Sequence, residues 1–244
     1  MDEGIVYIVG AGPGDPELIS IKAINIMKDA DVILYDRLVS KELLDKFDVE
    51  KVYVGRAVGD DYKHQEQTNQ LMLKYAKEGK KVVRLHGGDP FIFGRGGEEA
   101  EFLKENDIRF EIIPGISSII AASASSLVPL TDRRYASSLA IVTGHEDPMK
   151  ENERVRWEML PKAVDTIVVL MGISNLEKII DRLVDGGMDK DTRIAVIENA
   201  SKKEERIIYG KLDDIVMKVK EQKIKPPAVI IIGDVVKVSE RLRA

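Results

Sequence analysis

The chain of 244 residues contains no cysteine, which excludes disulfide bonds and metal sites built on thiolates. Its three histidines have no neighbours at metal-ligand spacing, so we expect no bound metal. The N-terminal segment "MDEGIVYIVG" begins acidic and holds only a short apolar run, so we expect a cytoplasmic protein without a membrane span. The net charge of −5 gives no overall attraction for nucleic acid or for an anionic membrane. An acidic ligand would therefore need a local basic cluster.

Apolar residues make up 44% of the chain and charged residues 32%, which is typical of a globular protein. In the first half, short β-branched runs alternate with segments of helical periodicity. Strands are predicted at 4–9, 31–35, 51–55, 80–86 and 109–114, and helices at 20–28, 40–47, 66–79 and 98–106. This alternation predicts a parallel, doubly wound sheet, whose ligands bind at the carboxyl ends of the strands.

A second α/β block follows Pro114 and opens with a helix of small residues at 116–127. Further strands are predicted at 138–144, 165–172, 193–199, 206–210 and 226–236, with helices at 174–187 and 212–222. Adjacent late strands indicate a mixed sheet. We therefore predict two α/β domains, residues 1–113 with a mostly parallel sheet and residues 117–244 with a mixed sheet.

Two glycine-rich segments follow predicted strands of the first block. In "GAGPGDP", Gly10 and Gly12 fit the dinucleotide pattern G-x-G-x-x-G, but Asp15 replaces its third glycine and Pro13 lacks an amide donor. The second segment, "GGDPFIFGRGG", lacks the Lys-Ser/Thr of a Walker motif. A nicotinamide enzyme and a plain structural turn both stay open, and Asp36 lies about where a ribose-binding acid would fall.

The second segment carries "FIF" at residues 91–93, inside a loop whose composition would usually be polar. Phe91 and Phe93 either anchor the loop to the body of the protein or face a ligand. Glycine backbones allow a ligand to approach closely, and Asp89 offers an acceptor for amino or hydroxyl groups. S-adenosylmethionine has the matching chemistry of adenine, ribose hydroxyls and a positive sulfonium. The residues allow this ligand without selecting it.

Six segments in order resemble signatures of the tetrapyrrole methylases, methyltransferases with two α/β domains and a cofactor cleft between them. The segments are "GAGPGDPELISIKA", "YDRLVS", "VVRLHGGDPFIFGRGGEE", "PGISS", "PLTDRRYASSLAIVTGH" and "LMG". Taken together, "YDRLV" and "GGDPFIFGRGGEE" are most similar to the members that act on uroporphyrinogen III. The resemblance implies two methyl transfers from S-adenosylmethionine, giving precorrin-2 for sirohaem or cobalamin biosynthesis and S-adenosylhomocysteine as by-product. It also implies a homodimer.

The resemblance further implies which residues contact the cofactor. They come from the glycine-rich loops, the small-residue helix and the second domain: Pro13, Gly87, Gly88, Asp89, Ile92, Ser117, Ser118, Met171, Ala200 and Ala228. Ser117 and Ser118 match a pair that is usually Thr-Ala, so only the small size is retained. Without the family context, Met171 would be interpreted as core packing.

Methyl transfer to a pyrrole carbon depends mainly on alignment of the reacting atoms, with an acid–base group to handle protons. The resemblance implies Asp36 as the proton acceptor; alone, it would be interpreted as a turn residue. Arg56 stands where the family usually has a lysine proposed as the proton donor. Because arginine stays protonated, it binds a carboxylate better than it donates a proton.

The implied substrate carries eight carboxylates, and bidentate arginine–carboxylate pairs would orient it. Basic residues cluster in or beside the signature segments: Arg37, Arg56, Lys63, His64, His86, Arg95, Arg133 and Arg134. From this cluster we take Arg37, His86, Arg95 and Arg133 as candidate substrate contacts. Two alternatives to the main hypothesis stay open. One is a tetrapyrrole methylase acting on a later precorrin, and the other is a non-catalytic S-adenosylmethionine-binding module.

The departure at position 56 yields a prediction. Arg56→Lys keeps the charge but loses the planar fork, so the KM for uroporphyrinogen III should rise while kcat stays nearly unchanged. If a proton donor is needed there, lysine should instead raise kcat. Steady-state kinetics separate these outcomes, and an Arg56→Met variant that equals the wild type in both constants would remove any role for the side chain.

Overall fold

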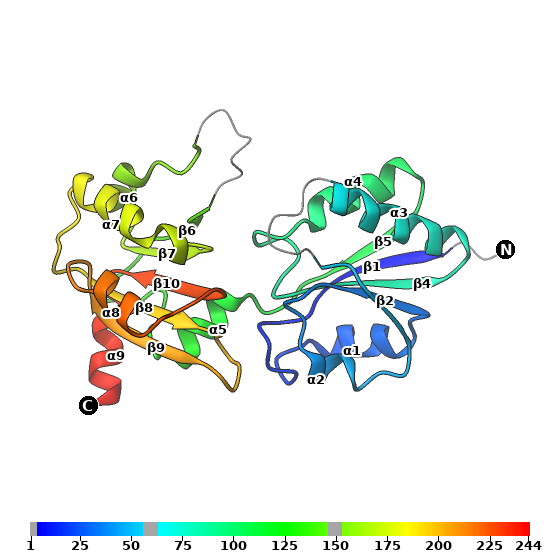
Figure 1. The fold of residues 1–244 in the computed structure, drawn as a ribbon, viewed down its shortest axis with the longest axis horizontal. Coiled ribbons are helices and arrows are strands. Elements are labelled where there is room, and N and C mark those ends of the chain that lie inside the picture. Colours follow the sequence, from blue (N-terminus) through cyan, green and yellow to red (C-terminus); the bar gives the residue numbers. More distant parts are fainter. Residues whose placement is uncertain (1–3, 56–62, 146–152) are drawn as a thin grey trace. The chain divides into compact units, whose positions relative to one another are not determined.

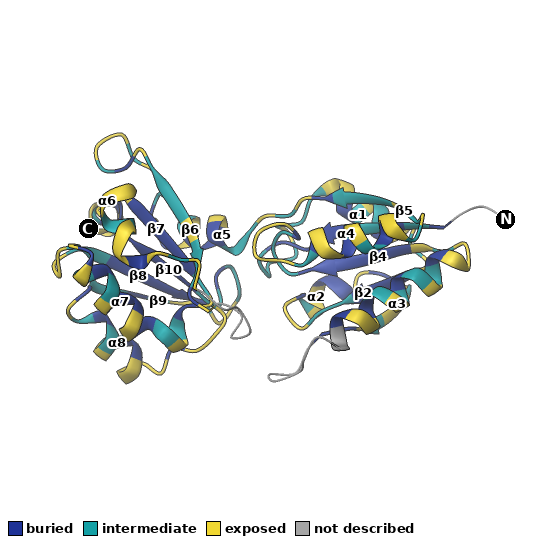
Figure 2. Cartoon of the chain, turned by 90° about the horizontal axis from the view of Figure 1, so that it is seen from above, coloured by how far each residue is buried: buried dark blue, intermediate teal, exposed yellow. Residues whose placement is uncertain are grey.

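The computed structural model of the protein describes residues 4–55, 63–145 and 153–244 (Figure 1). It consists of two compact units, Met1–Ser117 and Ser118–Ala244. Each unit is an α/β layer structure whose central strands are buried (Figure 2). None of the helices in the described ranges is long and apolar enough to cross a membrane.

The first unit holds a sheet of five strands in the order β3-β2-β4-β1-β5. Every pair in it is parallel, as the alternation of strands and helices predicts. The strands are β1 (Ile5–Gly10), β2 (Val32–Tyr35), β3 (Glu50–Tyr53), β4 (Lys81–His86) and β5 (Arg109–Ile113). Because all of them run the same way, their carboxyl ends share one edge of the sheet.

Helices cover both faces of this sheet (Figure 1). One face buries Ile33, Val83 and Leu85 under α1 (Ile21–Lys28) and α2 (Lys41–Leu44). The other buries Ile8, Leu34 and Val82 under α3 (Lys63–Lys77) and α4 (Gly96–Glu105). Successive side chains of β4 therefore face opposite helix layers. This two-residue alternation is typical of an extended strand that is buried on both faces.

The loops after β1 and β4 diverge. The chain leaves β1 toward α1 on one face and leaves β4 toward α4 on the other, although β1 and β4 are neighbours in the sheet. Such a divergence is the topological switch point at which open α/β sheets bind ligands. Both glycine-rich segments singled out in the sequence start at this point.

The second unit holds a mixed sheet in the order β6-β7-β10-β8-β9, which confirms the prediction for this half of the chain. Only β6 and β7 are parallel, and the remaining pairs are antiparallel. The strands are β6 (Leu139–Thr143), β7 (Thr166–Leu170), β8 (Arg193–Glu198), β9 (Arg206–Lys211) and β10 (Ala228–Ile232).

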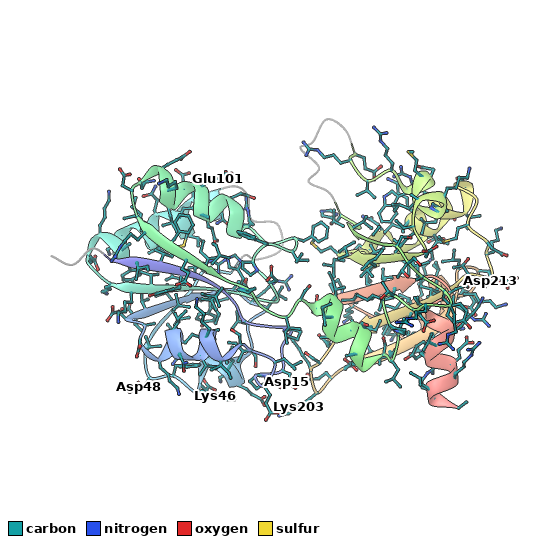
Figure 3. The ribbon with its side chains drawn as sticks, turned by 180° about the vertical axis from the view of Figure 1, so that it is seen from behind. Asp15, Lys46, Asp48, Glu101, Lys203 and Asp213 are labelled. Carbon is teal, nitrogen blue, oxygen red and sulfur yellow. The ribbon has the colours of Figure 1, made fainter. Side chains whose placement is uncertain are left out.

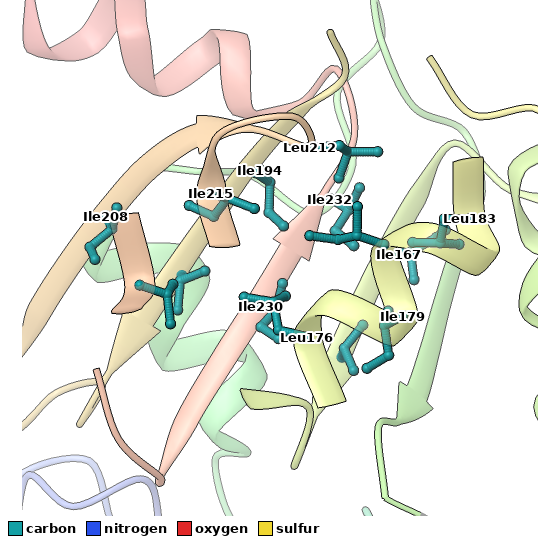
Figure 4. Close-up of a cluster of buried hydrophobic side chains, with 14 of the residues drawn as sticks. Ile167, Leu176, Ile179, Leu183, Ile194, Ile208, Leu212, Ile215, Ile230 and Ile232 are labelled. Carbon is teal, nitrogen blue, oxygen red and sulfur yellow. The ribbon is translucent and has the colours of Figure 1, made fainter. Parts of the chain in front are cut away.

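One face of this sheet packs against α7 (Leu176–Asp185) and α8 (Ile215–Glu221), around Ile167, Ile194 and Ile230 (Figure 4). The other packs against α5 (Ser118–Ser125) and the start of α9 (Val236–Arg243). The described part of this unit also holds three short elements: η1 (Trp157–Met159), α6 (Leu160–Ala163) and η2 (Ile173–Asn175).

The end of the chain differs from the sequence prediction. The strand expected at 226–236 occupies only residues 228–232, and α9 was not predicted. Gly233, with φ of 137°, ends the strand, and the chain turns into the helix through Asp234. The alternating valines of "VVKVS" are typical of a strand, but the buried Val236 and Val238 lie on a helix here. Tertiary packing outweighs β-propensity in this segment.

Candidate functional site

Three loops meet at the carboxyl edge of the first sheet, after β1, β4 and β5. The β1–β4 ladder extends beyond the strands, because the Ala11 amide donates to the carbonyl of His86 over 2.7 Å. Gly12 and Gly88 then exchange two backbone hydrogen bonds of 3.2 and 2.7 Å. The two glycine-rich loops are therefore joined to each other at the switch point.

The backbones of Gly10, Gly88 and Gly115 lie in direct contact. A Cβ atom at Gly115 would lie 2.2 Å from the carbonyl oxygen of Gly88, and one at Gly10 would lie 2.6 Å from the same oxygen. Gly88 has φ of 71°, a conformation that L side chains rarely adopt. The edge therefore presents bare backbone, and Gly87 and Gly88, both predicted cofactor residues, lie on it half-buried.

Asp89 links the loop after β4 to the loop after β5. Its Oδ1 accepts from the Phe91 amide over 2.8 Å, and its Oδ2 accepts from the Gly115 amide over 3.0 Å. In the structure the carboxylate accepts from two backbone amides of the protein, so the contact of Asp89 with the cofactor stays a prediction. Each carboxylate oxygen retains a second acceptor site, and the residue is half-buried.

The three large apolar side chains of the β4 loop do not anchor it to the body of the unit. Phe91, Ile92 and Phe93 are 58%, 40% and 46% exposed. Phe93 also has φ of 51°, which is uncommon for a bulky residue. Exposed apolar side chains beside a bare backbone edge are typical of a ligand-binding surface, so the first of the two sequence interpretations is not supported.

The turn after β2 packs against the same edge. Asp36 accepts from the Leu38 amide over 2.9 Å, and the Leu38 Cβ lies 2.6 Å from where a Cβ of Gly87 would be. Asp36 is half-buried and Arg37 is exposed. Pro13, in the loop after β1, is also half-buried. The first unit therefore gathers six predicted positions on the loops at one edge: Pro13, Asp36, Gly87, Gly88, Asp89 and Ile92.

Beneath the edge lies a buried ionic cluster. Glu99, the fourth residue of α4, is fully buried, and it contacts Arg84 and His86 of β4. Burial opposes ionisation of Glu99. The charge of Arg84 and the hydrogen bond with His86 outweigh that effect and lower the pKa of Glu99 to about 2. His86 is 5% exposed and packed behind the loop, whereas the sequence had placed it among the substrate contacts.

The other cationic candidates lie in different surroundings. Arg95 is half-buried, and its Nε and Nη2 donate to Glu98 over 3.0 and 2.6 Å. Arg56 and the side chains of Lys63 and His64 lie outside the described residues. Among the residues that the structure does describe, no group of three or more His, Asp or Glu side chains could hold a metal ion.

In the second unit, the sheet brings three predicted residues to one edge. Met171 directly follows β7, Ala200 lies two residues beyond β8, and Ala228 begins the antiparallel strand β10, where it pairs with Glu198. The Asn199 amide donates to the Pro227 carbonyl over 3.0 Å. Ala200 is buried, whereas Met171 is 51% exposed with φ of 55°. A methionine that is exposed and has a positive φ is not a core residue, which favours a functional interpretation.

The remaining predicted residues follow the first sheet in the chain, at the boundary of the two units and in the second unit. Ser117 precedes α5 and Ser118 begins it, and both are half-buried. Arg133 is exposed in the turn closed by the Asp132–Ala136 bridge. That turn is linked to α9, because Arg241 donates to the Tyr135 hydroxyl over 2.6 Å. Its described surroundings therefore differ from those of Met171, Ala200 and Ala228.

Sequence analysis missed two features of this site. Gly115 was part of the quoted "PGISS" segment but was not recognised as a contact of Gly10 and Gly88. The second feature is the partnership of Arg84, His86 and Glu99. A signal for it was present: a charged residue inside the apolar run "VVRLH" of a central strand needs a buried partner of opposite charge.

Comparisons with known proteins agree with this geometry. The family described as Tetrapyrrole (Corrin/Porphyrin) Methylases matches residues 5–216. The chain belongs to this family. It is 49% identical to the uroporphyrinogen-III C-methyltransferase of Methanocaldococcus jannaschii over 238 residues, covering 96% of this chain and 98% of that protein. The family resemblance of the sequence motifs is thereby confirmed.

Two solved structures place the fold in the same family. The uroporphyrin-III C-methyltransferase of Thermus thermophilus in complex with S-adenosylhomocysteine is 39% identical, with a TM-score of 0.81 over 96% of this chain and 94% of that one. A cobalt precorrin-4 methyltransferase of cobalamin biosynthesis is 31% identical, with a TM-score of 0.85 over 95% of each chain. The predicted fold class, a parallel sheet followed by a mixed one, is confirmed.

A pair of glycine substitutions tests the backbone contact at the edge. Gly115→Ala places a methyl group against the Gly88 carbonyl, so the free energy of unfolding should fall by about 1–3 kcal/mol, as overpacking does. Gly97→Ala is the control, because a Cβ there has no neighbour within 4 Å. On a helix this change should raise stability by about 0.4–1 kcal/mol. Denaturant titrations measure the free energy of unfolding of both variants. An equal change in Gly115→Ala and Gly97→Ala would contradict the backbone contact.

Proposed function

We propose that the chain is an S-adenosylmethionine-dependent uroporphyrinogen-III C-methyltransferase that adds two methyl groups in succession and forms precorrin-2. The observation that carries this proposal is the 49% identity with the M. jannaschii enzyme over nearly the full length of both chains. The bare backbone edge of the first unit, with its exposed apolar loop, supports it independently.

We place the cofactor at the carboxyl edge of the first sheet, against Pro13, Gly87, Gly88, Asp89 and Ile92. The glycines fit this assignment, because neither position readily takes a side chain: a Cβ at Gly87 would lie 2.6 Å from the Leu38 Cβ, and Gly88 has φ of 71°. Ser117, Ser118, Met171, Ala200 and Ala228 complete the proposed set by resemblance. The exposure and backbone of Met171 support its inclusion.

When bound, S-adenosylmethionine supplies a methyl group on a positively charged sulfur. The protein's part is then mainly to hold the acceptor carbon in line, which accounts for most of the acceleration in such displacements. Asp36 lies in the turn that contacts Gly87 and is half-buried. We propose that its carboxylate accepts the proton that leaves the pyrrole system.

We assign the substrate's carboxylates to Arg37, Arg95 and Arg133, with Arg56 added from the sequence. Arg95 would exchange its contact with Glu98 for one with the substrate. Such a partly exposed pair is worth at most about 1 kcal/mol, so the exchange costs little. His86 is the exception, because it is buried against Glu99; we place it behind the loop. The expected homodimer and cytoplasmic location rest on the resemblance alone.

One observation favours a second candidate function. The TM-score of the cobalt precorrin-4 methyltransferase, 0.85, exceeds that of the T. thermophilus enzyme, 0.81. Fold similarity within one family does not select a substrate, and the sequence identities favour uroporphyrinogen III. A non-catalytic binding module would keep the cofactor residues without turnover.

Anaerobic incubation with S-adenosylmethionine and uroporphyrinogen III, followed by mass analysis of the tetrapyrrole, tests the proposal. A product that has gained two methyl groups supports it. If uroporphyrinogen III is unchanged while a later precorrin gains one methyl group, the second candidate is correct. Cofactor binding with no methylated product would indicate the non-catalytic module.

The role of Asp36 yields a further prediction. Asp36→Asn keeps an oxygen that can accept from the Leu38 amide, so the turn should persist while the base is lost. We expect kcat to fall by about 10²–10⁴, with the Kd for S-adenosylhomocysteine within a few-fold of wild type. Asp48→Asn, an exposed position on the same unit (Figure 3), is the matched control. Unchanged kcat in Asp36→Asn would make Asp36 a turn residue only.

A further inference from the structure

The buried ionic cluster of the first unit has no part in the chemistry proposed above. It consists of Gln65, Arg84, His86 and Glu99. The side chain of Glu99 has no exposed surface, and those of Arg84 and His86 are 7% and 6% exposed. Ions buried in this way rarely add net stability compared with apolar residues of the same size. The cluster therefore calls for an explanation other than stability.

The two oxygens of Glu99 have different partners. Oε1 accepts from Arg84 Nε and from Gln65 Nε2, each over 3.0 Å. Oε2 lies 2.7 Å from His86 Nε2. Because an ionised carboxylate only accepts, the histidine nitrogen donates in this contact. Arg84 thus balances the charge of Glu99, Gln65 adds a neutral hydrogen bond, and His86 forms a separate connection.

That separate connection spans the base of the 87–95 loop. His86 is the last residue of β4, directly before Gly87. The helix α4 begins directly after the loop, and Glu99 lies in its first turn. The contact between Oε2 and Nε2 therefore joins the two ends of the loop. The backbone of His86 also sets the neighbouring loop, because its carbonyl accepts from the Ala11 amide.

Pro90 is buried, but the large apolar side chains of this loop contribute little to its position. Its three largest apolar side chains, Phe91, Ile92 and Phe93, are exposed. Polar contacts hold the loop at several points. Gly88 is bonded to Gly12, Asp89 accepts from Gly115, and His86 contacts Glu99 at the base. Buried hydrogen bonds with a charged partner are the stronger kind, so the base contact can hold the backbone where packing does not.

We propose that Glu99 and His86 are positioning residues that hold the base of the 87–95 loop closed, so that Gly87 and Gly88 keep the geometry needed to bind the cofactor. The identity of the ligand rests on the proposed function. The closure of the loop does not.

Three variants of the full chain test this inference. His86→Leu removes the donor, His86→Gln keeps a donor at the position of Nε2, and Val82→Ala opens a cavity on the same face of β4 away from the loop. Val82 is fully buried, which makes its truncation a control for general loss of stability. For each variant we would measure thermal stability, hydrogen exchange of the unliganded 87–95 segment, and the Kd for S-adenosylhomocysteine.

In His86→Leu we expect faster exchange confined to residues 87–95 and an affinity about 10-fold lower, the usual scale for losing a supporting hydrogen bond to a charged group. His86→Gln should restore both to within about 3-fold, since its amide can donate to Glu99. Val82→Ala should lower the melting temperature without changing either quantity.

The inference would be overturned if His86→Leu showed the same hydrogen exchange at residues 87–95 and the same Kd as the wild type. It would also be overturned if Val82→Ala changed both quantities as much as His86→Leu does. If His86→Leu does not fold, His86→Phe replaces it, because its ring fills the space of the imidazole without offering a donor to Glu99 and should also loosen the loop. Normal exchange at 87–95 in that variant would likewise overturn the inference. If the wild type binds no S-adenosylhomocysteine, the proposed function fails, while the exchange comparison still decides whether the base contact closes the loop.

Discussion

The close approach of three backbone segments at Gly10, Gly88 and Gly115 is the constraint on which the first unit depends. The segments leave β1, β4 and β5 at the same edge, and a Cβ on Gly10 or Gly115 would overlap the backbone of the others. With no side chains between them, the loops hydrogen-bond to each other and leave their outer backbone uncovered. A ligand can then contact the sheet edge itself, at the point where the chain diverges to both faces.

Charge is handled differently at the surface and below it. The protein is acidic overall, yet its candidate site combines a neutral backbone edge with a few arginines on the surrounding loops. Glu99 beneath the edge stays ionised because Arg84 and His86 compensate for its burial. A fully paired charge of this kind ties strand to helix with directional contacts. The exposed phenylalanines of the loop cannot provide that directionality by packing.

Much of this structure could be predicted from the sequence, because it follows from local patterns. Hydrophobic periodicity predicted the strands of both sheets, and the glycine-rich motifs predicted which loops form the candidate site. Long-range contacts could not be predicted in this way. No local pattern indicates that Asp89 accepts from Gly115 or that Leu38 packs on Gly87. The helix α9 was missed because its valines favour a strand, and only packing against the second sheet makes it helical.

A crystal structure of the protein with bound S-adenosylhomocysteine tests the central claim most directly. Our account predicts the ligand at the carboxyl edge of the first sheet, in contact with the backbone of Gly87 and Gly88, with the Gly10–Gly88–Gly115 contact intact. A ligand bound at the amino edge of that sheet, or one that separates the loops after β1 and β4, would contradict it.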